Sequence, residues 1–176
     1  MGRTRAWSWT IRPGLLSLTL VLQSWAPSSH AEGFGRWESK LEACVLLQGL
    51  VDWPLQAQRQ SCGRLRLEQN LEGLLTVRLI TPSGSQRFGS QNLVFGGTLA
   101  PGQRPMRCGS DGQCKPRWPM RLEVSTVATN LALEESLAPT IPLARLAKGS
   151  CLLERQALQC QARDQDGQVW EAKARF

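Results

Sequence analysis

Polar and apolar residues alternate at the C-terminal end of the chain, on both sides of a short turn. The apolar positions are Leu158, Cys160 and Ala162 before the turn and Trp170, Ala172, Ala174 and Phe176 after it. This period of two is typical of β-strands with one buried face. A three-residue loop, Gln165 to Gly167, pairs Ala162 with Trp170, whereas a two-residue turn would place apolar residues opposite polar ones. The pattern therefore predicts a β-hairpin with Gly167 in a left-handed conformation.

The same alternation recurs earlier in the chain. Leu65 to Glu68 and Leu75 to Ile80 flank a turn at 70–73 and predict a second hairpin. Leu93 to Phe95 predicts a short strand that ends at the glycine pair 96–97, and Met120 to Ala128 predicts a longer strand.

The segment after residue 36 is ambiguous. Trp37, Leu41, Cys44 and Val45 recur at helical spacing, yet alternate residues from Leu41 onward are also apolar. A short helix from about Glu38 to Gln48 is the preferred prediction, and a strand is the alternative.

Taken together, the pattern predicts a mainly β protein with seven or eight short strands, arranged as a small antiparallel sandwich or barrel and preceded by one short N-terminal helix. Prolines, glycines and two cysteines crowd the range from Pro101 to Pro119, which is expected to be an irregular loop closed by a disulfide.

The first 31 residues have the features of a secretory signal peptide. Arg3, Arg5 and Arg12 precede an apolar run from Leu15 to Ala26, and residues 29–31 end in a small-x-small pattern. The run is shorter than the roughly 20 residues that a membrane-spanning helix needs. We therefore expect cleavage after residue 31, a single domain over 32–176 without a transmembrane segment, and an exported protein, either periplasmic or secreted.

Removal of this segment lowers the positive charge. The whole chain has a formal net charge of +7, but residues 32–176 retain 18 Lys and Arg against 14 Asp and Glu, a net of +4. This mild excess, in an exported protein, does not indicate nucleic-acid binding.

Six cysteines lie in 32–176, and an even number in an oxidising compartment predicts three disulfides. Their connectivity is open at this point, because six cysteines can pair in many ways. Sequential pairing is the economical choice: Cys44 with Cys62, Cys108 with Cys114, and Cys151 with Cys160. A zinc site is disfavoured because no Cys-x-x-Cys motif occurs and the only histidine, His30, precedes the predicted cleavage.

The composition excludes several kinds of catalysis. Residues 32–176 contain no histidine and no tyrosine, which removes histidine-based acid–base chemistry, and disulfide pairing removes the thiols. No spacing singles out a carboxylate pair of the glycosidase type. The stretch from Asp164 to Gly167 opens like a calcium loop but lacks its closing glutamate, so a turn is predicted there. Neither an enzymatic activity nor a metal or cofactor is expected.

The leading hypothesis is a non-enzymatic binding or structural protein of the cell envelope or exterior. Its candidate contact with an anionic partner is the loop from Pro101 to Pro119, which carries Arg104, Arg107, Lys115, Arg117 and Trp118. Guanidinium groups beside an indole suit an acidic polysaccharide, a lipid headgroup or an acidic protein surface. Alternatively, the charges only keep the protein soluble and the indole joins the core. A second hypothesis is a lipocalin-like barrel that carries a small apolar ligand.

Overall fold

The computed structural model describes residues 34–50, 61–70, 73–81, 92–129 and 143–176, and every regular element in these ranges is a β-strand. Within them no helix is long and apolar enough to cross a membrane. The predicted signal segment, residues 1–31, lies outside the described residues. The strands are β1 (Gly35–Lys40), β2 (Ala43–Leu50), β3 (Arg64–Gln69), β4 (Leu74–Ile80), β5 (Asn92–Leu99), β6 (Arg107–Cys108), β7 (Cys114–Lys115), β8 (Met120–Thr129), β9 (Leu143–Leu153), β10 (Ala157–Asp164) and β11 (Gln168–Arg175).

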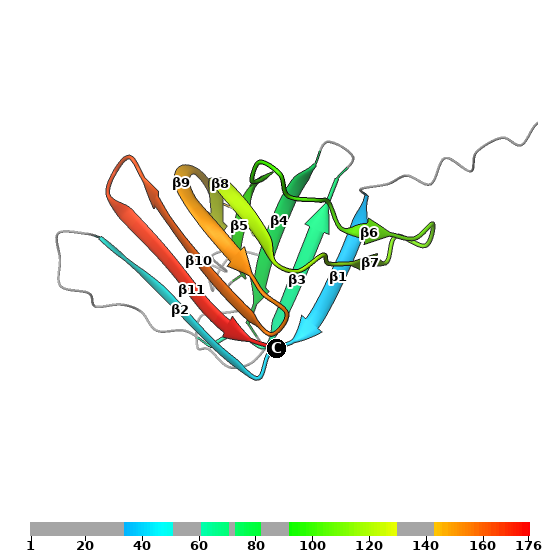
Figure 1. The fold of residues 1–176 in the computed structure, drawn as a ribbon. Coiled ribbons are helices and arrows are strands. Elements are labelled where there is room, and N and C mark those ends of the chain that lie inside the picture. Colours follow the sequence, from blue (N-terminus) through cyan, green and yellow to red (C-terminus); the bar gives the residue numbers. More distant parts are fainter. Residues whose placement is uncertain (1–33, 51–60, 71–72, 82–91, 130–142) are drawn as a thin grey trace, which may run out of the picture.

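Nine of these strands form one antiparallel sheet in the order β1-β3-β4-β5-β8-β9-β10-β11-β2, which curls into a half-barrel (Figure 1). The remaining two, β6 and β7, form a separate small hairpin. The predicted mainly β, disulfide-stapled antiparallel architecture is thus confirmed, with more strands in the described residues than the seven or eight expected.

The preferred N-terminal helix, Glu38 to Gln48, is wrong. The segment forms the two strands β1 and β2, separated by a corner at Leu41 and Glu42. They lie at opposite edges of the sheet, where β1 pairs with β3 and β2 pairs with β11. Because these partners are distant in sequence, tertiary pairing overrides the local helical spacing.

The corner brings the two halves of the curled sheet together. The Leu41 N–H donates to the Gly63 carbonyl oxygen beside β3, at 3.0 Å, and the Glu42 N–H donates to the Arg175 carbonyl oxygen of β11, at 2.9 Å. Figure 1 shows β1 and β2 diverging from this point, next to the C-terminus. The Cys44–Cys62 disulfide joins β2 to the residues before β3 at the same place.

All three sequential disulfides are confirmed: Cys44–Cys62, Cys108–Cys114 and Cys151–Cys160. The third joins residues that stand directly opposite each other in β9 and β10. Each bond therefore closes a short loop or cross-links neighbouring strands.

The C-terminal hairpin has the predicted register. Ala162 pairs with Trp170 and Cys160 with Ala172, and all four side chains are buried. The three-residue loop between β10 and β11 places Gly167 at a φ of +82°. This part of the prediction is confirmed because turn chemistry and side-chain parity are both local properties.

The aspartates of this loop build the turn. Oδ1 of Asp164 accepts hydrogen bonds from the backbone N–H groups of Asp166, at 3.0 Å, and Gln168, at 2.9 Å. Nη1 of Arg145 lies 3.3 Å from a carboxylate oxygen of each aspartate. Among the residues described, no group of three or more side chains could hold a metal ion.

Replacing Gly167 by alanine is expected to lower the free energy of unfolding by about 1–2 kcal/mol, because a Cβ disfavours the left-handed conformation. The shift would be measured by equilibrium denaturation with the disulfides intact. Gln165→Ala, in the same loop but on an exposed residue, is the control and should change stability by less than about 0.5 kcal/mol. Equal losses for both variants would contradict the conformational explanation.

Two expectations between residues 92 and 119 need correction. The glycine pair does not end the strand, since β5 continues to Leu99 and accommodates a register shift between Gly96 and Gly97. A Cβ on Gly97 would overlap the carbonyl oxygen of Glu123, so β8 approaches here closer than a side chain allows. The range from Pro101 to Pro119 is not wholly irregular either, because the disulfide Cys108–Cys114 closes a hairpin that contains β6 and β7.

One face of the sheet carries the core and the other carries charge. The fully buried side chains include Phe95 on β5, flanked by Val77 on β4 and Val127 on β8. On the opposite face of β1, β3 and β4, arginines and glutamates alternate in ion pairs. These pairs are Arg64–Glu38, Arg66–Glu38, Arg66–Glu68 and Arg78–Glu68.

Candidate functional site

The candidate site is the hairpin of β6 and β7, which projects from the half-barrel beside β1 (Figure 1). Its two strands form two cross-strand residue pairs: Arg107 opposite Lys115, and Cys108 opposite its disulfide partner Cys114. The turn is closed by a hydrogen bond from the Gly109 N–H to the Gln113 carbonyl oxygen, at 2.8 Å. Oδ1 of Asp111 also accepts from the Gln113 N–H, at 3.0 Å. We call this segment, residues 105–117, the basic hairpin.

The basic hairpin is attached to the sheet by buried and backbone contacts. The buried Met106 donates its N–H to Oε1 of the buried Gln69 on β3, at 2.8 Å. On the other side of the hairpin, the Gly112 carbonyl oxygen accepts from the Arg36 N–H of β1, at 2.9 Å. With the disulfide, these contacts hold the backbone in place before any partner binds.

Three cations surround a hollow of about 600 Å³ on this hairpin: Arg107, Lys115 and Arg117. All three are exposed, and none forms an ion pair with an acid in the ranges that the structure describes. Among the described residues that line the hollow, Asp111 is the only acid, and its carboxylate already accepts the Gln113 N–H.

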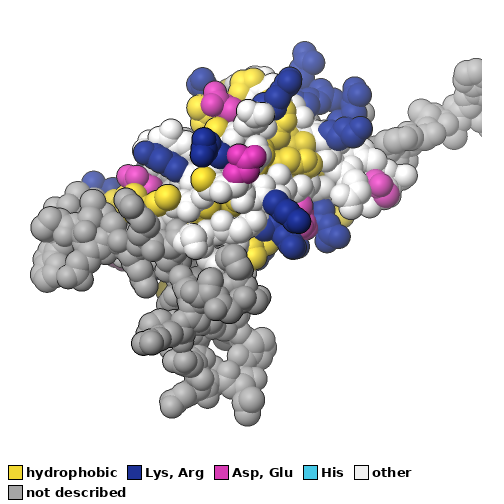
Figure 2. Space-filling view, turned by 90° about the horizontal axis from the view of Figure 1, so that it is seen from below, with side chains coloured by type: hydrophobic (Ala, Val, Ile, Leu, Met, Phe, Trp, Pro, Cys, Tyr) yellow, Lys and Arg dark blue, Asp and Glu magenta, His cyan; other side chains and the backbone are white. Residues whose placement is uncertain are grey.

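The arrangement leaves like charges facing each other. Arg107 and Lys115 are directly opposite in the β6–β7 pairing, and like charges in that position repel. The arginines Arg64, Arg66 and Arg78 of the sheet face, in contrast, are each within 4 Å of a glutamate. Figure 2 shows Lys and Arg side chains gathered on the same side as β1, β3, β6 and β7 in Figure 1. The hairpin cations, unlike these three arginines, are therefore not compensated by an acid of the described chain.

Two of the predicted site residues lie outside the hollow. Arg104 is exposed but does not line it. Trp118 packs against Trp37 of β1, with ring centroids 5.5 Å apart, and against Phe176 after β11, at 5.8 Å. The structure thus brings together the three cations Arg107, Lys115 and Arg117 and directs Trp118 into an aromatic cluster.

This aromatic cluster connects β1, the segment before β8 and the C-terminal residue. Trp37 and Phe176 are also in contact, with centroids 5.4 Å apart and planes inclined by 63°. Each ring comes from a different part of the chain, and each is partly buried against the core. Sequence reasoning missed the cluster because alternation shows which face a residue occupies but not which distant residue it meets.

No family model, no curated protein and no solved structure matches this chain.

Proposed function

We propose that this is an exported, non-enzymatic binding or structural protein of the cell envelope or exterior, and that its basic hairpin contacts an anionic partner. The observation that supports this most directly is the opposed pair Arg107 and Lys115, with Arg117 beside it, on a backbone fixed by a disulfide. An anion between these groups would replace their mutual repulsion with attraction.

The cysteines and the missing side chains support the other parts of the proposal. Three disulfides are consistent with an exported protein, since such bonds persist in oxidising compartments. No cysteine remains free for nucleophilic chemistry, and residues 32–176 contain neither histidine nor tyrosine.

The alternative from the sequence, a lipocalin-like barrel with an apolar ligand inside, has less support. The inner face carries one continuous cluster of buried side chains, in which Phe95 and Leu67 are fully buried and Trp170 is 2% exposed. These side chains take up space that an interior ligand would need. We therefore favour binding at the surface.

The test is the triple variant Arg107→Ser, Lys115→Ser and Arg117→Ser, with both neighbouring cysteines retained. Its matched control is Arg121→Ser, Arg155→Ser and Lys173→Ser, which removes the same charge from exposed positions outside the hollow. Affinity would be measured for polygalacturonate, for anionic phospholipid vesicles and for polyglutamate at several salt concentrations. With the probe that resembles the natural partner, the hairpin variant should bind about tenfold more weakly than the control variant does.

The three probes distinguish the source of the anionic group, since the site predicts a selective loss with one class. Equal weakening by the hairpin and control variants with every probe would show that binding is diffuse electrostatics and would refute the site. Arg104→Ser, which removes one charge outside the hollow, should have less effect than Arg107→Ser.

A further inference from the structure

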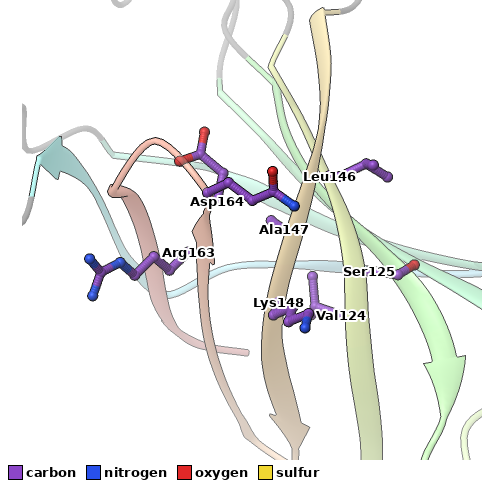
Figure 3. Close-up of a pocket in the computed structure, with 8 residues that line it drawn as sticks. Val124, Ser125, Leu146, Ala147, Lys148, Arg163 and Asp164 are labelled. Carbon is purple, nitrogen blue, oxygen red and sulfur yellow. The ribbon is translucent and has the colours of Figure 1, made fainter.

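A second hollow, of about 650 Å³, opens where the pairing of β8 with β9 is irregular (Figure 3). Val124 pairs with Gly149 and Thr126 pairs with Leu146, so Ser125 alone stands opposite two residues of β9, Ala147 and Lys148. Such a bulge interrupts the ladder and redirects side chains, and bulges are frequent next to binding sites. All of the residues at the irregularity except Thr126 and Gly149 line the hollow.

The apolar side chain that the hollow presents to solvent is Leu146. Val124 and Ala147 belong to the core and are each only 5% exposed, whereas Leu146 is 74% exposed, the largest fraction among the large hydrophobic residues that the structure describes. Covering a leucine this exposed with a ligand lowers the free energy of the complex, since apolar surface is removed from water. The hollow is also within the roughly 300–1,000 Å³ range of small-molecule sites.

Two cations stand on the neighbouring part of the lining. Lys148 on β9 and Arg163 on β10 are directly opposite each other, and both are exposed. Neither forms an ion pair with any acid of the described residues. The acid in the described lining is Asp164, whose side chain is 4% exposed. Its Oδ2 lies 3.3 Å from Nη1 of Arg145, so its charge is already compensated.

The apolar and the charged parts are separated along the sheet. In Figure 3 Leu146 and Ser125 point to one side of β9, and Arg163 points to the other. An elongated molecule that crosses β9 would therefore have its apolar end near Leu146 and its charged end near Lys148 and Arg163. A ligand that fits this geometry has a negatively charged group attached to an apolar chain.

We propose that this hollow is a binding site for one single-chain amphiphile with a carboxylate head, of the long-chain fatty-acid class. The carboxylate bridges Lys148 and Arg163, where it relieves their repulsion, and the chain lies against Leu146, which is on the same face of β9 as Lys148. This site is separate from the basic hairpin and does not depend on the function proposed for it.

The experiment is calorimetric titration of the full oxidised protein with dodecanoate below its micelle concentration. We expect one molecule per chain. Lys148→Gln with Arg163→Gln should weaken binding about tenfold, because two charge-assisted contacts are lost, and Leu146→Ser should do so by a similar factor through lost apolar contact. The matched controls are Arg155→Gln with Lys173→Gln for charge and Leu50→Ser for an exposed leucine on β2, none of which lines the hollow.

The neutral methyl ester of dodecanoate lacks the negative charge and so tests the contribution of the carboxylate. Acetate lacks the long apolar chain and so tests the contribution of that chain. Both should bind at least about tenfold more weakly than dodecanoate, since each lacks one half of the recognition. The proposal is overturned if the ester binds as tightly as the acid, or if the control variants weaken binding as much as the site variants. It is also overturned if the protein binds anionic phospholipid vesicles but not dodecanoate. The last result would make the patch a membrane-contact surface.

Discussion

Replacing Phe95 by alanine is expected to lower the free energy of unfolding by about 3–5 kcal/mol, the largest effect of any single substitution considered for this protein. Phe95 is fully buried on β5, in the middle of the nine-stranded sheet. Its cross-strand neighbours Val77 and Val127 are buried as well and belong to strands on either side. Because the strands are fixed by their ladders, the sheet cannot collapse into the space that the ring leaves.

Equilibrium denaturation of the oxidised protein measures this loss. The matched control is Phe34→Ala, since Phe34 is 60% exposed before β1 and should change stability by less than about 0.5 kcal/mol. Similar losses in the two variants would show that the middle of the sheet is not the packed core that the burial pattern indicates.

Removing the Cys44–Cys62 disulfide by a double alanine substitution is expected to cost about 3 kcal/mol, more than removal of either of the other two bonds. These cysteines are 18 residues apart, against 6 for Cys108–Cys114 and 9 for Cys151–Cys160. In the chain-entropy account, the longer loop restricts the unfolded chain more, and the corresponding costs are about 2 and 2.5 kcal/mol.

Loss of the Cys44–Cys62 disulfide should also have a local effect that loss of the Cys108–Cys114 disulfide does not have. Cys44–Cys62 lies at the corner where β1 and β2 diverge, so its loss should increase hydrogen exchange at the Leu41 N–H, which donates to Gly63. The Cys108→Ala and Cys114→Ala double variant is the control and should leave this amide protected. If both double variants expose it equally, the bond does not hold the two halves of the sheet together.

The range 101–119 shows which features of the candidate site the sequence could predict and which it could not. The sequence pointed to the range 101–119 as a basic segment, and the structure places Arg107, Lys115 and Arg117 around one hollow within it. Trp118 was a candidate for the same contact, with the core as its alternative place, and its ring packs with Trp37 and Phe176 against the core. Which aromatic rings meet is decided by the curl of the sheet, and no periodicity along the chain encodes it.

The hollow at the irregular part of β9 could not have been found from the sequence. In the sequence Leu146 is one of several apolar residues after Pro139, and nothing there marks Lys148 and Arg163 as a pair. They become neighbours because β9 and β10 pair in one particular register. The bulge beside Ser125 likewise exists only in the pairing of two strands.

The sequence by itself determined the β class and the register of the last hairpin, and it favoured the sequential disulfides that the structure contains. Each of these depends on contacts between residues close in the chain, where alternation, turn residues such as Gly167 and short loop lengths leave few alternatives. The tertiary structure alone decided that residues 38–48 form two edge strands instead of a helix, and which cations face each other. Those outcomes depend on hydrogen bonds and side-chain contacts between strands far apart in sequence, so their energies appear only once the sheet has formed.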